Sequence, residues 1–492
     1  MAQAGFSTFS SSFWADADDR RWLGLLAASL ALLLGIRIIA LLLNQTDLFF
    51  DEAQYWAWSE EPAFGYYSKP PLIAWIIGSV TALCGDGSVC VRLASPLLHT
   101  LTALTVAALG WRLYDARVGA LAGLTYALLP AVSLSSGIIS TDVPLLLCWA
   151  AALILFWTII RDQSRSYLPG LLLGLVFGVG LNAKYAMAWF VMCAGIYLLV
   201  TPSARRAVAD FRLPLAASVG LAMLVPNIAW NGQNRFATLS HTADNANWSG
   251  PLLHPNKAAE FFLAQFGVFG PILFAALLII AWRAWRQQLP EADRFLLAFA
   301  LPVLIAITLQ ALLSRAHANW AAVSYVAACV LVTATMVRDM AWNWLRGSFA
   351  LHAVAMVVLI VGTSTAGLLA LPGVRDPFAR VLGWQGVAQA TAAELAKAEQ
   401  AGQPYRAIAA DGRALSASLL YYLRDIDVPI YAFGPIGNLA PKDHFQLTRP
   451  ISGTTLSPVL FVSLGGQRKV FTRFGQSAYL GTQKLPAGST MS

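Results

Sequence analysis

The sequence predicts a polytopic α-helical membrane protein with a small α/β domain at its C-terminal end. Of its 492 residues, 58% are hydrophobic and only 12% are charged, whereas soluble domains carry about 25% charged residues. Apolar runs of about 20 residues, long enough to cross a bilayer as helices, recur between residues 22 and 371. Beyond Pro372 the composition is that of an ordinary soluble domain.

The first 371 residues divide into an N-terminal segment and a membrane domain. Residues 1–19 are rich in Ser and Ala and are predicted to be a disordered cytoplasmic segment. Residues 20–371 are predicted to form the transmembrane catalytic domain, with outer loops at 44–90 and 231–257. The apolar stretch 71–83 is too short to cross, so it is interpreted as an interfacial or re-entrant helix begun by two prolines. Hydropathy indicates about eleven spans, at 22–43, 91–111, 118–133, 143–160, 168–182, 186–200, 213–230, 258–281, 294–313, 319–337 and 349–371.

The distribution of basic residues predicts the orientation. If the N-terminus is cytoplasmic, the inner loops hold twelve arginines, and the outer loops hold five cations, which are Lys69, Lys184, Arg235, Lys257 and Arg315. Cytoplasmic loops are expected to carry such an excess, provided that the stretch 71–83 does not cross. Topology therefore accounts for the net charge of +8 better than nucleic-acid binding does.

Residues 372–492 are predicted to form an α/β domain on the outer side. Helix-like segments at 391–400 and 414–423 alternate with strand-like segments at 405–410, 428–433 and 458–464. No glycine-rich phosphate loop follows these strands, and the domain offers no obvious catalytic set. Its expected role is to help bind an acceptor.

Five cysteines give no metal or haem spacing. Cys148, Cys193 and Cys329 fall inside apolar helices, where buried thiols are structural by default. Cys84 and Cys90 flank a Gly-Asp-Gly turn, and on the outer face they could pair.

A polar, aromatic segment between apolar spans is the predicted centre of the chemistry. Residues 47–71 read DLFFDEAQYWAWSEEPAFGYYSKPP. A carboxylate just outside the bilayer can act as a general base, so Asp51 and Glu52 are catalytic candidates. Adjacent carboxylates need not point the same way, so one can catalyse while the other orients it or binds a cation. The alternative is that both acids stabilise the first turn of a helix.

Lys69 and the aromatic residues of this segment each allow two interpretations. Lys69 is a further catalytic candidate that can bind a phosphate, or it can extend to lipid headgroups as an anchor. Tyr55, Tyr66 and Tyr67 can stack on a sugar, or they can belong to an interfacial aromatic belt. Residue type alone favours the belt.

Polar residues at the outer ends of later spans complete the candidate site. Asp142 is costly at a membrane edge unless it is solvated, paired or functional, and it can also cap the helix that follows. Lys184 and Arg315 can extend to the membrane surface as the polar ends of spans, or they can hold a donor phosphate. Further substrate-binding candidates are His317, Asn319 and Trp320, and weak metal candidates are Glu52, His241 and His254.

Five short motifs, spread over about residues 20–370, carry a resemblance to a known family. They are DEAQYWAW, GYYSKPPLIAW, STDVP, GLNAKY and HANWAAVSY. Together they resemble the bacterial branch of the protein O-mannosyltransferase-like glycosyltransferases, which have the GT-C membrane fold. This branch includes lipid A aminoarabinose transferases and lipopolysaccharide core galacturonosyltransferases. The first loop here is more similar to the uncharacterised and galacturonosyl members, which leaves the sugar open.

The resemblance implies a reaction and assigns roles within it. Such enzymes move a monosaccharide from a polyprenyl phosphate to a periplasmic acceptor, here lipid A, lipopolysaccharide core or another glycan. It implies that Asp51 is the essential acid, that Lys69 and Asp142 are functionally important, and that Lys184 and Arg315 lie near the carrier phosphate. No cofactor is required, although a divalent cation is possible. The expected location is the bacterial inner membrane, with the active site and the C-terminal domain in the periplasm.

Two other functions remain open from the sequence. A transporter or flippase for polyprenyl-linked sugars would place charges deep within its spans, whereas here the ionisable residues other than arginine collect at one face. A protein O-glycosyltransferase would use the same chemistry on a protein acceptor. The expected partners are the polyprenyl-phosphate sugar, a lipid or glycan acceptor and membrane lipids, with no nucleic acid.

Overall fold

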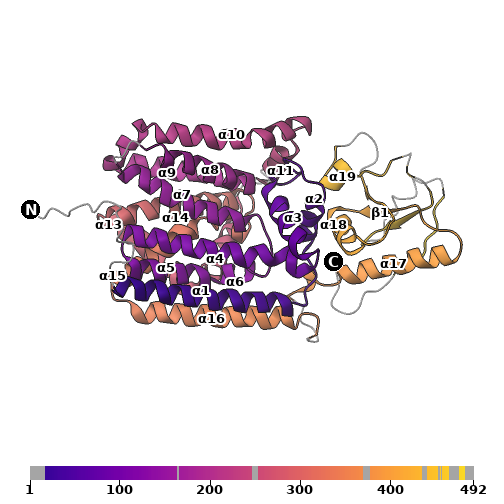
Figure 1. The fold of residues 1–492 in the computed structure, drawn as a ribbon, viewed down its shortest axis with the longest axis horizontal. Helices are drawn as coiled ribbons and strands as arrows, with labels where there is room; N and C mark the ends of the chain where they lie inside the picture. Colours follow the sequence, from indigo (N-terminus) through magenta and orange to yellow (C-terminus); the bar gives the residue numbers. More distant parts are fainter. Residues whose placement is uncertain are drawn as a thin grey trace, which may run out of the picture.

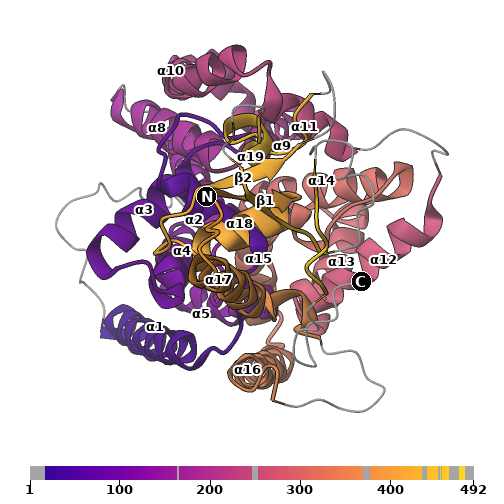
Figure 2. The same cartoon turned by 90° about the vertical axis from the view of Figure 1, so that its right-hand side faces the viewer.

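The computed structural model describes residues 17–162, 166–246, 253–368, 377–434, 440–452, 455, 457–464 and 476–482. Helices form a long bundle, and the C-terminal domain covers one end of it (Figure 1). Viewed from that end, the domain lies over the middle of a ring of helices (Figure 2).

Within the described residues, the bundle contains six helices that are long and apolar enough to cross a membrane, or seven if one bent pair counts as a span. The six are α1 (Ala17–Leu43), α4 (Ser88–Leu113), α7 (Asp142–Arg161), α10 (Arg212–Gln233), α14 (Glu291–Leu313) and α16 (Trp342–Ser364). The multi-pass prediction is confirmed, whereas the figure of eleven spans stays a prediction.

Shorter helices fill the rest of the bundle. They are α5 (Ala116–Leu128), α6 (Pro130–Ser135), α8 (Leu168–Ala183), α9 (Trp189–Val200), α12 (Pro255–Val268), α13 (Pro271–Arg286) and α15 (Ser324–Arg338). Four 3-10 turns connect or extend the elements, namely η1 (Tyr185–Ala188), η2 (Pro202–Ala209), η3 (Ala318–Ala321) and η4 (Ala379–Val381).

The core lies between α7, α9 and α14. Edge-to-face and tilted ring contacts join α7 to its neighbours. Trp149 of α7 meets Phe190 of α9, while Phe156 and Trp157 of α7 meet Phe299 and Phe295 of α14. In its most apolar window α7 is 72% buried, compared with 17% for α10. Helix α7 is therefore central, and α10 presents most of its surface to the membrane.

Two predicted spans are broken, and glycine or proline explains each break. The span expected at 258–281 was wrong as a single helix, because α12 and α13 meet at 115°. Gly270 has φ +90° there, and a Cβ on it would lie 1.9 Å from Nε2 of His352. The span expected at 118–133 divides into α5 and α6 at Leu129, because Pro130 disfavours the helical conformation in the residue before it.

The first outer loop forms two short helices between the bundle and the C-terminal domain (Figure 1). These are α2 (Phe50–Ser59) and α3 (Leu72–Cys84), and a disulfide joins Cys84 to Cys90 in the first turn of α4. Helix α3 matches the short helix predicted at 71–83. In the second outer loop, α11 (Ala237–Ala246) follows α10.

The C-terminal domain has a parallel three-stranded sheet with the order β2-β1-β3. Its elements are α17 (Trp384–Gln400), β1 (Ala407–Asp411), α18 (Arg413–Tyr422), β2 (Ile430–Phe433), α19 (His444–Thr448) and β3 (Val459–Val462). Ile408 of the central strand pairs with Ile430 on one side and Leu460 on the other. The predicted α/β character of the domain is confirmed, and α19 was not predicted.

Candidate active site

Residues from four distant parts of the sequence meet where the bundle faces the C-terminal domain. Burial and the neighbouring ammonium of Lys184 lower the pKa of Lys69 to about 8, and the carboxylates of Asp51 and Asp142 act in the opposite direction. These groups are therefore close enough to affect one another's charge. Most of the residues that the sequence singled out lie in or beside this cluster.

Asp142 is held between two of the other candidates. It is the first residue of α7, and its side chain is nearly buried. Nζ of Lys184 donates to Oδ1 over 2.7 Å, and Nδ2 of Asn319 donates to Oδ2 over 2.8 Å. Lys184 follows the last residue of α8, and Asn319 belongs to η3. The ends of three elements thus converge on one carboxylate.

Asp51 occupies the first turn of α2 and is partly open to solvent. Its Oδ1 accepts a hydrogen bond from Nη1 of Arg413 over 2.7 Å, and both side chains are about one-third exposed, at 36% and 37%. Oδ2 accepts no hydrogen bond within the described part of the chain. One carboxylate oxygen is therefore available to a substrate, as a general base requires.

Glu52 points the opposite way and is completely buried. Arg92 donates to both of its oxygens, from Nε over 3.0 Å and from Nη2 over 2.8 Å. The backbone N–H groups of Phe49 and Ile139 donate to the same carboxylate. Protein groups therefore surround this carboxylate, and Glu52 has a structural role. The sequence interpretations of Glu52 as a catalytic residue or a metal ligand do not fit this geometry.

Lys69 is partly buried, and its Nζ has no hydrogen-bond or ion-pair partner among the described residues. It lies in the turn before α3, where its backbone oxygen accepts a hydrogen bond from the N–H of Tyr66. A cation that the protein leaves without a counter-charge is well placed to bind an anion.

The three tyrosines of the loop have different surroundings. Tyr66 is fully buried, stacks on Trp58 with ring centroids 4.5 Å apart, and donates to the backbone oxygen of Trp58. This packing contradicts the expected substrate contact of Tyr66. Tyr67 donates to the backbone oxygen of Pro441 over 2.9 Å, so it joins the loop to the C-terminal domain. Tyr55 is also buried, and burial together with the charge of Asp51 raises its pKa.

Arg315, His317 and Trp320 lie at the edge of the cluster. Burial lowers the pKa of His317, and the charges of Arg315, Arg380, Lys184 and Lys69 lower it further. Arg315 is exposed, and its guanidinium makes no hydrogen bond within the described residues. His317 contacts the ring of Trp320 edge-on, and Trp320 packs against the bundle core.

The weak metal candidates are not brought together. His241 lies on α11 beside the ring of Tyr67, His254 precedes α12, and Glu52 is enclosed by Arg92. Within the described ranges, no three His, Cys, Asp or Glu side chains form a group that could hold a metal ion.

Sequence reasoning missed the two arginines that hold the acidic pair. Arg92 comes from α4, 40 residues after Glu52, and Arg413 comes from the domain 362 residues after Asp51. Arg92 could have been recognised from the sequence by one feature, because it is a charged residue near the start of an apolar span. Arg413 had no such feature.

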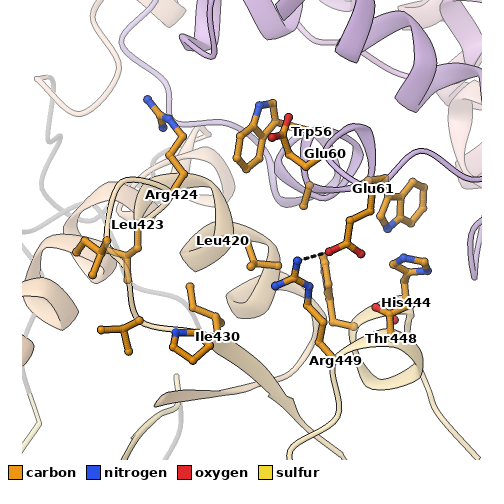
Figure 3. Close-up of a pocket in the computed structure, with 16 residues that line it drawn as sticks. Trp56, Glu60, Glu61, Leu420, Leu423, Arg424, Ile430, His444, Thr448 and Arg449 are labelled. Atoms are coloured by element: carbon orange, nitrogen blue, oxygen red, sulfur yellow. Dashed lines mark hydrogen bonds and ion pairs between the residues drawn. The ribbon is translucent and has the colours of Figure 1, made fainter. Parts of the chain in front are cut away.

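A cavity of about 250 Å³ lies on the same junction between α2 and the C-terminal domain, apart from the charged cluster. Figure 3 shows its apolar wall, including Trp56, Leu420 and Ile430, and the ion pair between Glu61 and Arg449. None of the residues that line it belongs to the cluster around Lys69.

Known proteins are similar to this chain in sequence and in fold. Residues 68–230 match the dolichyl-phosphate-mannose-protein mannosyltransferase family. The lipid A galacturonosyltransferase RgtD of Rhizobium johnstonii is 37% identical over 431 residues, which are 87% of this chain and 88% of that protein. The lipopolysaccharide core galacturonosyltransferase RgtA of the same organism is 30% identical over 267 residues, covering 53% of this chain and 51% of that protein.

A solved structure shows the same fold. Apo ArnT from Cupriavidus metallidurans aligns with a TM-score of 0.61 at 18% identity, over 88% of this chain and 90% of that one. Fold and relatives together define a multi-pass membrane glycosyltransferase. The chain belongs to the GT-C glycosyltransferase family that includes RgtD, which confirms the resemblance drawn from the sequence motifs.

Proposed function

We propose that the protein transfers galacturonic acid from a polyprenyl phosphate to lipid A at the periplasmic face of the bacterial inner membrane. The full-length similarity to a lipid A galacturonosyltransferase supports the sugar and the acceptor. A structure of ArnT bound to undecaprenyl phosphate, which shares the fold with a TM-score of 0.56 at 18% identity over 85% of this chain and 86% of that one, makes a polyprenyl-phosphate donor a natural choice.

The unpaired ammonium of Lys69 is the observation that carries this proposal. It lies within electrostatic range of Lys184 and Arg413 as well as of the two acids. Each acid already has a cation of its own, because Asp51 pairs with Arg413 and Asp142 pairs with Lys184. Lys69 therefore adds a positive charge that forms no ion pair with a carboxylate of the described residues. A galacturonosyl phosphate is anionic at both the phosphate and the sugar carboxylate, so it suits this charge.

Asp51 is assigned as the general base. Its free Oδ2 takes the proton of an acceptor hydroxyl while the hydroxyl oxygen attacks the anomeric carbon of the sugar. The bond from that carbon to the phosphate oxygen breaks, and the electron pair leaves with the polyprenyl phosphate. This single displacement inverts the anomeric centre and needs no second carboxylate as nucleophile.

Lys69 and Lys184 are assigned to the leaving group, with Arg315 at the edge of the same region. Charge develops on the phosphate as the glycosidic bond breaks, and preplaced cations stabilise it without reorganisation. Asp142 and Asn319 hold Lys184 in place. Glu52 and Arg92 fix α2 against the bundle, so that Asp51 faces the donor.

The test is a transfer assay with purified protein, polyprenyl phosphates carrying galacturonic acid, mannose or aminoarabinose, and lipid A as acceptor. Galacturonic acid appearing on lipid A, together with release of polyprenyl phosphate, is the expected result. Assays with and without a chelator show whether a divalent cation takes part. Transfer to a protein acceptor instead of lipid A would contradict the acceptor, and movement of the donor across vesicles without turnover would contradict the reaction.

A further inference from the structure

The C-terminal domain supplies the charged partner of Asp51. Nη1 of Arg413 lies 2.7 Å from Oδ1 of Asp51, although the two residues are 362 positions apart. No other described cation hydrogen-bonds to this carboxylate. The charge of Asp51 acts to raise the pKa of Lys69, but Lys69 makes no hydrogen bond to Asp51.

Local structure fixes where Arg413 begins its helix. Strand β1 is the central strand of the sheet and ends at Asp411, and α18 starts at Arg413. Gly412 makes the turn between them at φ +87°, a conformation that glycine adopts readily. The guanidinium therefore projects from the rigid junction of a strand and a helix.

Helix α2 receives the guanidinium through three residues in its first two turns. Beyond the contact with Asp51, Nη1 of Arg413 lies 3.3 Å from Oε1 of Gln54. The guanidinium carbon also lies 4.8 Å from the ring centroid of Phe50, which is a cation–π contact. An exposed ion pair alone contributes little to stability, but here the contacts of Arg413 with Gln54 and Phe50 support it.

The other end of α18 is docked on the same loop. Tyr421 donates to the backbone oxygen of Asp86 over 2.7 Å, and its ring meets that of Trp56 edge-on. The hydroxyl of Tyr422 accepts a hydrogen bond from the backbone N–H of Leu48 over 2.9 Å. With both ends of α18 fixed, the position of Arg413 relative to Asp51 is set by the docking of the whole domain.

We propose that Arg413 is a positioning residue for Asp51, supplied to the active site by the C-terminal domain. Arg413 holds Oδ1 and leaves Oδ2 directed to the acceptor hydroxyl, which is the position that a general base requires. The domain is then part of the catalytic centre and not only an acceptor-binding cover. This inference rests on the proposed function, in which Asp51 is the base.

The experiment compares Arg413→Gln and Arg413→Lys with Arg406→Gln in the intact chain, reconstituted in lipid. Arg406 is an exposed arginine of the same domain whose side chain makes no hydrogen bond or ion pair within the described residues, so it is a matched control. Each variant is assayed with whichever polyprenyl-phosphate sugar the wild type turns over. The readouts are kcat, donor affinity and the amount of folded protein.

Arg413→Gln is expected to lower kcat about 10- to 100-fold, the effect of losing one hydrogen bond to a charged group. Donor affinity should be unchanged. Arg413→Lys should recover part of kcat, and Arg406→Gln should match the wild type. Arg413→Gln added to Asp51→Asn should cost nothing further, because both act on one group.

Wild-type kcat in Arg413→Gln would overturn the proposal. So would an equal loss in Arg406→Gln, or a loss of kcat in Arg413→Gln that follows a loss of folded protein and is not partly recovered in Arg413→Lys. The Asp51→Asn variant separates this failure from that of the proposed function. Full turnover in Asp51→Asn, or no turnover of any donor by the wild type, contradicts both. Lost turnover in Asp51→Asn with normal turnover in Arg413→Gln contradicts only the role of Arg413.

Discussion

Lys184 and Asp142 form an ion pair of 2.7 Å that joins the end of α8 to the start of α7. A lysine ammonium has three donors, and the other two are not used by any hydrogen bond that the described residues make with Lys184. The pair therefore holds the ammonium in place and leaves it able to donate to a phosphate.

Lys184→Met is expected to weaken polyprenyl-phosphate binding about 10- to 100-fold, because a charge-assisted hydrogen bond is lost and Asp142 is left without its counter-charge. Calorimetry with polyprenyl phosphate alone measures this without turnover. Lys257→Met is the control, since Lys257 pairs with Glu260 on the exposed surface of α12. Equal affinity in Lys184→Met and the wild type would remove Lys184 from the phosphate site.

Glu52→Gln is expected to destabilise the protein by about 3–5 kcal/mol, the typical cost of removing one partner from a buried ion pair. Arg92, nearly completely buried, would then keep its charge without a carboxylate. Thermal unfolding of the purified protein measures the loss, and adding Arg92→Met should restore part of the stability. Normal unfolding with abolished turnover in Glu52→Gln would instead make Glu52 a catalytic residue.

We expect kcat/KM for the donor to fall at high pH, because Lys69 loses its charge there. Its pKa is lowered to about 8, chiefly by burial, so the ammonium is charged below that pH and neutral above it. The value of kcat/KM for the donor, which reports the free enzyme, should fall as the pH rises through about 8. In Lys69→Arg this fall should disappear, because arginine stays charged. A wild-type profile that is flat in this range would refute the assignment.

Gly65→Ala tests how the first loop is seated on α10. A Cβ at Gly65 would lie 2.6 Å from Cε3 of Trp230, closer than packing allows. Overpacking of this kind costs about 1–3 kcal/mol, and the displacement would reach Lys69 four residues later, so lower stability and lower kcat are expected. Gly87→Ala is the control, because a Cβ there meets nothing within 4 Å. Matching behaviour of the two variants would show that this seating is unimportant.

The sequence predicted the cluster at the bundle end because hydropathy places the ends of spans. Asp142 and Lys184 each stand at such an end, and opposite ends of neighbouring helices meet in an antiparallel bundle. Hydropathy also indicated that the stretch 71–83 is a short helix, and the C-terminal strands and helices followed from local composition.

Contacts between residues that are far apart in the sequence could not be predicted from local patterns. Asp51 and Glu52 are adjacent acids of the same type, and only the fold shows that one meets Arg413 while the other is enclosed by Arg92. Tyr66 looks like an interfacial tyrosine until Trp58 is found stacked on it. At the bend between α12 and α13, a side chain larger than that of Gly270 would collide with His352, and no local sequence pattern places His352 there.

The most direct test of the central claim is the rate of sugar transfer by Asp51→Asn, measured beside its affinity for the polyprenyl-phosphate sugar. Asparagine keeps the shape of the side chain and cannot accept the proton, so transfer should be abolished while donor binding and thermal unfolding stay close to those of the wild type. Transfer at the wild-type rate in this variant would contradict the assignment of Asp51 as the general base and, with it, the proposed mechanism.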